Sequence, residues 1–477
     1  MGARATESLL AEEEVSAIND AEAGMSSPQR SKPHRRVVIA GGGVAGLEAL
    51  LALRSLLTLA EAHMIAPNRH FVYQPLAVGE PFDLAQTHLS ELAEITADQG
   101  AKLHVDALEL VDGEHHRVHL ASGAELPYDA LILAVGARRR QWLEGALHFG
   151  GAGDAPAFRS LLERFERGIV QRLAFVNPPG ASWTLPLYEL ALLTASHFAD
   201  HRVIGVELTL ITPERDPLGA FGPAAGQMLR SLLADRGIAL RAGTYVEEIA
   251  DGELHLHPAG TLGVDEVVTL AELDGPALAG VPANAAGFII VDDHCRVIGL
   301  EDAYAAGDGT TFPVKQGGIA TQQADAAVEA IAAQMGAPVT PEPLRPTLRG
   351  MLLTGIAPTY LRARISGTTG DSFEIATSPL WWPPSKVAGR YLGPYLAARG
   401  PLTRGEVLED RPPPSEDAEQ LQASHEEARR LALTFAERDA ADGHYHSAVQ
   451  WLEVIERLEG VLPPGYASKR ADWVERS

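Results

Sequence analysis

Three glycines near the N-terminus, Gly41, Gly43 and Gly46, have the spacing that a chain needs to hold a pyrophosphate on its backbone. The first allows a sharp turn from strand to helix, the second allows close approach of the phosphates, and the third lets the helix pack on the sheet. An apolar run at residues 37–40 precedes them, and a helical pattern at 47–57 follows. The sequence therefore predicts a dinucleotide site at a helix N-terminus.

The carboxylate that usually binds the ribose of such a nucleotide is missing. An Asp or Glu is expected about 20 residues beyond the last glycine, but that position falls near Ala66. Asn68 follows closely, and its side-chain amide offers hydrogen bonds in place of the acid. We therefore expect Asn68 to contact this part of the nucleotide.

A second strand–turn–helix unit begins near residue 170, but its turn, at 177–183, keeps only Gly180. Without the other glycines, close approach of the backbone to a pyrophosphate is hindered. Pro186 suits the first turn of the following helix, so the anion-binding helix end is kept in part. Glu214 ends the next strand, where it would accept a ribose hydroxyl of NADH, whereas Arg215 would accept the 2′-phosphate of NADPH. The sequence does not choose between these donors.

Cysteine chemistry is limited by the presence of one cysteine, Cys295. An intramolecular disulfide and a multi-cysteine metal or iron–sulfur site are therefore excluded. We expect Cys295 to be a small buried residue rather than a nucleophile. We predict no metal site, because His444 and His446 lie on opposite sides of a helix start and no third ligand is evident.

Alternating strands and helices have to position these groups. Further apolar strands are expected at residues 62–66, 102–105, 108–111, 117–120, 130–135, 173–176, 206–211, 238–242, 287–291 and 303–306. Helices are expected over 185–198, 224–236 and 314–335, and two more strands within 348–365. The alternation is typical of an α/β protein with parallel sheets.

The composition limits the partners of the chain. Its 477 residues suggest two or three domains. A net charge of −24 argues against a nucleic-acid partner, because phosphates bind to basic surfaces. No apolar run reaches the roughly 20 residues of a membrane span. We expect a cytoplasmic protein, with residues 1–34 as a disordered acidic tail.

Three segments resemble the FAD signatures of the pyridine-nucleotide-linked flavoprotein reductases. They are residues 41–46, Tyr128-Asp129-Ala130 with residues 134–138, and residues 303–308. Segments 71–76 and 315–324 are similar to the branch that contains type II NADH dehydrogenases and sulfide:quinone reductases. The resemblance covers roughly residues 35–400. It implies two nested Rossmann-like domains, FAD bound by the first, and a C-terminal domain that completes the flavin site.

This resemblance gives the expected domain boundaries. They are an FAD-binding domain in two parts (35–155 and 287–337), an NAD(P)H-type domain (156–286), a C-terminal interface domain (338–409), and a linker with a helical tail (410–477). The tail is similar to one helix–turn–helix of the tetratricopeptide type, which cannot bury its own face and has to dock elsewhere.

The resemblance also implies roles for individual residues. Gly41, Gly43 and Gly46 would bind the FAD pyrophosphate, Ala107 the adenine through its backbone, and Asp308 the ribityl or phosphate part. Gln74, Pro75, Lys315 and Gln316 would lie near the isoalloxazine. The predicted cofactor-binding set is Gly41, Gly42, Gly43, Val44, Ala45, Gly46, Asn68, Gln74, Pro75, Ala107, Ala134, Gly136, Gly307, Asp308, Gln316 and Gly317.

Two residues are predicted to take part in catalysis. Glu189 falls where relatives place a carboxylate facing the flavin and nicotinamide; the alternative is a helix-start Glu favoured by the dipole. Lys315 would stabilise the anionic reduced flavin; the alternative is a solvated lysine.

Residues 378–404 are aromatic and basic and contain no acid. Such a segment can lie in a membrane interface, as in quinone-using relatives, or it can pack in a domain or dimer interface. We favour the packed interface, and a homodimer stays open.

These features favour an FAD-dependent oxidoreductase that moves hydride from NAD(P)H through the flavin to a quinone or another small acceptor. The altered turn at 177–183 supports an alternative in which the donor is not NAD(P)H. A second alternative is a flavin-binding sensor or interaction protein that docks through its tails.

Overall fold

The computed structural model describes residues 35–399 except 88, 259, 367 and 368, together with parts of 433–456 and residues 462–476. The predicted disordered tail (1–34), the linker at 410–415, and His444 and His446 lie outside the described residues.

Five parallel strands form the first sheet, in the order β20-β9-β1-β2-β5. Their bounds are β1 Arg36–Ala40, β2 Glu61–Ile65, β5 Lys102–His104, β9 Ala130–Leu133 and β20 Ala303–Ala305. Alternate residues of β1 face opposite layers: Val37 and Ile39 pack on the helical side, and Val38 packs on the other. Burial on both faces explains why the strand is wholly apolar.

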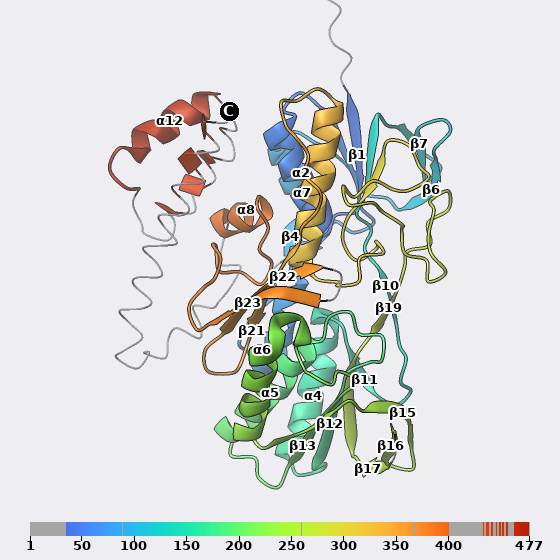
Figure 1. The fold of residues 1–477 in the computed structure, drawn as a ribbon, viewed down its shortest axis with the longest axis vertical. Coiled ribbons are helices and arrows are strands. Elements are labelled where there is room, and N and C mark those ends of the chain that lie inside the picture. Colours follow the sequence, from blue (N-terminus) through green and yellow to red (C-terminus); the bar gives the residue numbers. More distant parts are fainter. Residues whose placement is uncertain are drawn as a thin grey trace, which may run out of the picture. The chain divides into compact units, whose positions relative to one another are not determined.

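Helices α2 (Val44–Leu56) and α7 (Gly317–Gln334) run side by side over this sheet (Figure 1). The opposite face carries the antiparallel sheet β6-β7-β8, with bounds Leu108–Asp112, Arg117–Leu120 and Glu125–Pro127. Strand β20 returns to this sheet after more than 150 intervening residues, pairing with β9. The first domain is therefore interrupted by the second, as the nested fold requires.

The second sheet is also parallel and has the order β11-β18-β12-β13-β14. Its bounds are β11 Leu147–Phe149, β12 Arg172–Val176, β13 Glu207–Thr212, β14 Ile238–Ala242 and β18 Glu266–Leu270. Helices α4 (Ala155–Glu166), α5 (Leu185–Asp200) and α6 (Gly222–Asp235) share one core with it. The antiparallel sheet β15-β16-β17 (Tyr245–Ala250, Glu253–His257, Thr261–Gly263) packs in a separate apolar cluster against the other face.

A two-stranded antiparallel ribbon marks the crossings between the two sheets. Strand β10 (Arg138–Arg140) carries the chain out of the first sheet, and β19 (Glu272–Asp274) carries it back (Figure 1). A third, antiparallel sheet, β21-β22-β23 (Thr347–Leu352, Thr359–Ser366, Thr369–Ala376), packs on the core that contains α5 and α6.

The remaining elements are short or lie outside these sheets. They are β3 His70–Val72, η1 Gln74–Phe82, β4 Leu89–Glu91, α3 Leu92–Asp98, η2 Ala152–Asp154, η3 Gly219–Phe221, α8 Leu392–Arg399 and α12 Tyr466–Arg476.

Two local predictions are wrong. Residues 287–291 form only isolated bridges, because Gly287 adopts φ +82° and its N–H closes a turn on Asn284. Helix α7 starts at Gly317 rather than 314, because the Gln316 side chain accepts the Ile319 N–H at 3.0 Å and caps the helix. The two strands expected within 348–365 are present as β21 and β22, and a third strand, β23, follows outside that range.

The described part of the aromatic and basic segment packs on the first domain. Tyr391 and Tyr395 are buried, and α8 joins the core of α2 and α7. Glu48 on α2 accepts the N–H groups of Tyr391 (2.9 Å) and Leu392 (2.6 Å), which satisfies donors at the start of α8. Burial raises the pKa of Glu48 to about 7. These contacts favour the packed interface over a membrane-facing helix.

Described residues of the tail form an apolar cluster around Trp451 and Trp473, and Trp382 of the aromatic and basic segment packs against this cluster. Within the described residues, no helix combines the length and the apolar character that a membrane crossing demands.

Candidate active site

The Gly41–Gly46 turn has the geometry of a pyrophosphate cradle. Gly41 has φ +127°, and a Cβ on it would lie 2.1 Å from the Ala134 carbonyl oxygen. A Cβ on Gly46 would lie 1.9 Å from the Gly41 carbonyl oxygen. A Cβ on Gly43, by contrast, would meet no atom within 4 Å. Two glycines are therefore needed for packing, and the third leaves open space at the N-terminus of α2, where an anion is favoured.

The ends of the neighbouring strands face the same region. Because β20, β9 and β1 are adjacent and parallel, their carboxyl ends place Gly307, Gly136 and Gly41 along one edge of the sheet. Gly136 (φ +73°) also faces open space. Gly307 donates its N–H to the buried side chain of Gln323 at 2.8 Å, a contact that the sequence analysis did not identify.

The other predicted residues of this edge have packing contacts. A Cβ on Gly42 would lie 2.5 Å from Leu92, so this glycine is needed for packing. Ala134 donates its N–H to Ala40 at 2.7 Å, and Ala45 is buried near Gly307. Val44 is half-buried as the first residue of α2. The open space at two glycines and the free helix end fit the pyrophosphate of FAD.

Two predicted contacts are less well placed. Asn68 lies beyond the end of β2 and is exposed. The backbone of Ala107 already has protein partners, since its N–H donates to Asp106 (2.8 Å) and its carbonyl accepts from Ala121 (2.9 Å).

One cavity of about 280 Å³ brings most of the predicted flavin-site residues together. The predicted residues in its lining are Gln74, Pro75, Glu189, Asp308, Lys315, Gln316 and Gly317. Glu189 comes from α5 of the second domain. The other residues come from the first domain, and Gly317 is the first residue of its helix α7. Arg349–Met351 of the third sheet also line it, and so do Lys386, Arg139 and Glu272, which the sequence analysis did not single out as site residues.

Glu189 forms a buried ion pair with Lys386 at this cavity. Both carboxylate oxygens lie 2.6 Å from Lys386 Nζ, and Leu353 donates its N–H to Oε1 at 2.8 Å. The side chains are 1% and 6% exposed. Burial raises the pKa of Glu189, and the charge of Lys386 opposes that shift. Lys386 is 197 residues away in sequence, so only the fold reveals the pair.

Asp308 and Lys315 form a second, looser set of charges. Burial raises the pKa of Asp308, and Lys315 opposes the shift. Burial lowers the pKa of Lys315 to about 8, against the effect of Asp308. Lys315 Nζ donates to the Thr310 carbonyl and lies 4.1 Å from the centre of the Phe288 ring. Lys315 is therefore a partly desolvated cation in the cavity, not a solvated surface lysine.

The second nucleotide turn has few free N–H groups. Pro178 and Pro179 have no N–H, Gly180 donates to Glu272 at 3.3 Å, and Ala181 donates to Pro178 at 3.1 Å. In the first turn of α5, Pro186 lacks a donor and Leu187 donates to Thr184 at 3.0 Å. A pyrophosphate would therefore find few of the donors that such a turn normally offers.

Glu214, the predicted ribose acid, is held by the protein. The Tyr188 hydroxyl donates to its carboxylate, and Thr212 Oγ1 lies 3.4 Å from Oε2. Burial raises the pKa of Glu214. Its carboxylate is thus partly engaged before any ribose arrives.

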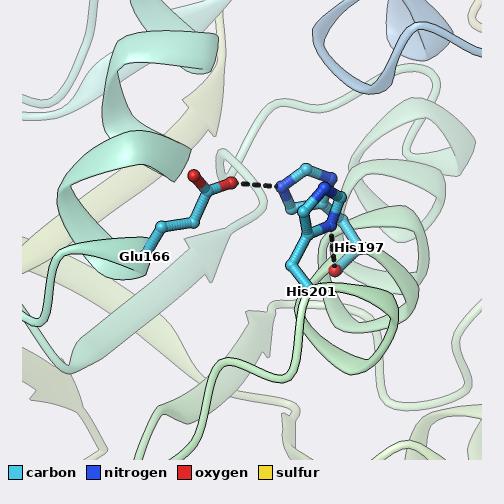
Figure 2. Close-up of side chains that lie close together, drawn as sticks. All are labelled: Glu166, His197 and His201. Carbon is cyan, nitrogen blue, oxygen red and sulfur yellow. Dashed lines mark hydrogen bonds and ion pairs between the residues drawn. The ribbon is translucent and has the colours of Figure 1, made fainter.

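A further set of polar side chains lies at the opposite end of α5 from Glu189. His197 Nε2 lies 2.7 Å from Glu166 Oε1, and His201 Nδ1 lies 2.9 Å from the His197 carbonyl oxygen (Figure 2). The two imidazole rings stack with centroids 4.0 Å apart. One ligand atom from each of Glu166, His197 and His201 lies within 4.8 Å of the others, and the Glu166–His197 contact ties α4 to α5.

Comparison with known proteins places the chain in a family. Residues 35–332 match the family model of the pyridine nucleotide-disulphide oxidoreductases. An NADH dehydrogenase-like protein of Mycobacterium tuberculosis is 28% identical over 291 residues, which cover 57% of this chain and 72% of the relative. The ferredoxin–NAD(+) reductase component of the biphenyl dioxygenase system of Paraburkholderia xenovorans is 25% identical over 295 residues, covering 59% and 69%.

A solved structure has the same fold. The sulfide:quinone oxidoreductase of Aquifex aeolicus superposes with a TM-score of 0.65 at 20% identity, covering 72% of this chain and 86% of that one. The nested sheets, the glycine cradle and the family match agree with one another. The chain belongs to the pyridine nucleotide-disulphide oxidoreductase family and is an FAD-dependent oxidoreductase.

Proposed function

We propose that this protein oxidises NAD(P)H and passes the electrons through FAD to a quinone or another small acceptor. The observation that carries the proposal is the single cavity in which Lys315 and Gln316 from the first domain meet Glu189 from the second. Such a junction is where a flavin held by one domain and a nicotinamide held by the other would come into contact.

The residues of the cavity have distinct proposed roles. Bound FAD would accept a hydride and then release the electrons. Lys315 and the N-terminus of α7 would supply positive potential for an anionic ring. The Glu189–Lys386 pair would hold a proton at the cavity wall. An acceptor that takes up protons when it is reduced would receive a proton from this pair.

The proposed domain assignment keeps the boundaries expected from the sequence, although β11 (Leu147–Phe149) of the first segment pairs in the second sheet. Residues 35–155 and 287–337 would bind FAD, 156–286 would bind the nicotinamide donor, and 338–409 would close the flavin site. Support comes from β20, which rejoins the first sheet, and from Arg349 and Lys386, which line the cavity.

For the acceptor, we favour a small neutral molecule. The relatives of this chain include quinone reductases and a ferredoxin reductase. A chain of net charge −24 repels acidic proteins, so a neutral quinone suits it better. Peripheral membrane contact through 378–404 and a homodimer stay predictions; vesicle flotation and sedimentation velocity would test them.

A second candidate uses a donor other than NAD(P)H. The observation that favours it is the shortage of N–H groups in the turn at 177–181. Dithiol exchange between two cysteines of one chain is excluded, since the sequence has one cysteine, Cys295, and it is buried.

Anaerobic stopped-flow absorbance distinguishes the two candidates. The flavin absorbance band at about 450 nm is followed after mixing with NADH and, separately, with NADPH. Rapid bleaching by either nucleotide supports the first candidate and identifies the donor. A bound flavin that neither nucleotide bleaches would contradict it and favour the second.

A further inference from the structure

Glu272 occupies the position in the second domain where a dinucleotide phosphate would be expected. Strand β18 is adjacent and parallel to β12, with Val176 opposite Thr269, so both strands end at the same edge. The turn with Gly180 follows β12, and Glu272 follows β18. Glu272 Oε1 accepts the Gly180 N–H at 3.3 Å, and this side chain is 16% exposed.

A basic residue on the neighbouring strand is also engaged. Arg140 lies directly opposite Glu272 in the β10–β19 ribbon and forms an ion pair with it. Arg140 Nε also lies 3.5 Å from Asp274 Oδ2. Two carboxylates thus surround one guanidinium, and the Gly180 N–H and the Arg140 side chain that could bind a phosphate are bound to Glu272 instead.

We propose that Glu272 is a specificity-determining residue that competes with the dinucleotide pyrophosphate for the Gly180 N–H and for Arg140. The proposal rests on the proposed function, since it concerns the donor half of the same cavity. A dinucleotide has to displace the carboxylate and overcome its negative charge, which weakens binding. Once Glu272 is displaced, Arg140 loses this ion-pair partner, and Arg139 of the same strand lines the cavity.

Glu272→Gln tests this directly. Glutamine keeps an acceptor for Gly180 and the approximate shape, but it removes the charge and frees Arg140 from one partner. We expect calorimetric titration of the FAD-loaded protein with ADP-ribose, which carries the pyrophosphate without the nicotinamide, to give a Kd about tenfold lower than for the unaltered protein. Adenosine, which has no phosphate, should bind equally to both proteins.

Glu266→Gln is the matched control. Glu266 starts β18, at the opposite end of the same strand, and pairs with Arg164. It removes the same charge from the molecule, so ADP-ribose affinity should not change. Glu272→Ala, checked for flavin content and melting temperature, serves as a second variant if Glu272→Gln is unstable.

Two results would overturn the proposal: equal ADP-ribose affinity in Glu272→Gln and the unaltered protein, or weaker binding in the variant, which would make Glu272 a ligand contact. These readouts do not depend on flavin reduction. Failure of both nucleotides to bleach the flavin would contradict the proposed function, whereas tighter ADP-ribose binding by Glu272→Gln would still support the role of Glu272.

Discussion

At the scale of single residues, the site depends on charges that burial has altered. The side chains of Glu189 and Lys386 are both almost fully buried. Burying either charge without the other would strongly destabilise the fold. Lys315 is less enclosed, and its titration falls within an accessible pH range. These two cases give two residue-scale predictions.

Lys386→Met should lower the free energy of unfolding by about 3–5 kcal/mol near neutral pH, because it leaves a buried carboxylate without its partner. The native pKa of Glu189, already raised by burial, would rise further. Between the unfolded and native pKa values the native state binds more protons, so stability falls as pH rises. Urea unfolding at pH 5 and pH 8 should therefore show the larger loss at pH 8.

The double variant Glu189→Gln/Lys386→Met is the control for this prediction. It removes both charges, so it should recover most of the lost stability. If the single and double variants unfold at the same urea concentration at both pH values, the ion pair does not have the energetic role described here.

Lys315→Met should lower the flavin reduction potential at pH 7 by about 30 mV or more, an amount equivalent to about 1.4 kcal/mol for two electrons. The lysine is positively charged below its pKa of about 8, and that charge favours the anionic reduced flavin. The difference from the unaltered protein should shrink as pH rises through 8. Spectroelectrochemical titration measures it. Lys315→Arg should match the unaltered protein at pH 7 and have the higher potential at pH 9, because arginine keeps its charge there. Identical potentials for Lys315→Met and the unaltered protein at pH 7 would show that Lys315 does not face the flavin.

At the scale of elements, the β1–α2 turn contains one glycine that the fold requires and another that borders the expected cofactor site. Gly46 packs against the Gly41 carbonyl, whereas Gly43 borders open space. The same chemical change, one added methyl group, therefore has different consequences at two positions three residues apart.

Gly43→Ala should leave the melting temperature of the apoprotein within a few degrees of the original, because its Cβ meets no protein atom. It should strongly reduce the flavin content, because the methyl group fills the room for the pyrophosphate. Gly46→Ala should lower both the melting temperature and the flavin content, because its Cβ would overlap the Gly41 carbonyl oxygen. Absorbance ratios and thermal unfolding measure the two effects. Full flavin content in Gly43→Ala would show that the pyrophosphate lies elsewhere.

At the scale of the whole molecule, the net charge of −24 affects encounter with ligands. NAD(P)H is an anion, so raising the salt concentration from about 20 mM to about 300 mM should increase the second-order rate constant of flavin reduction, since salt screens the repulsion. The rate of reoxidation by a neutral quinone should change much less. A decrease for NAD(P)H would indicate a basic path to the cavity that outweighs the net charge.

The sequence predicts much of the fold and part of the candidate site. The apolar run before Gly41 and the glycine spacing predicted a dinucleotide site, because these signals are local and are set by backbone geometry. The two nested domains and the FAD were implied by the resemblance of residues 41–46, 134–138 and 303–308 to the FAD signatures of the flavoprotein reductases. Glu189 and Lys315 were also predicted to lie at the flavin site, and the structure brings both to one cavity. The single cysteine excluded dithiol exchange within the chain.

Only the tertiary structure decided which charges face one another. The Lys386 partner of Glu189 comes from a segment whose composition suggested an interface, and the Glu272 partner of Gly180 lies 92 residues away. A buried ion pair or a carboxylate against a distant N–H leaves no pattern in neighbouring residues, since its free energy depends on distance and desolvation. The glycines and strands therefore predicted where the nucleotides would bind, and packing decided which charges surround those positions.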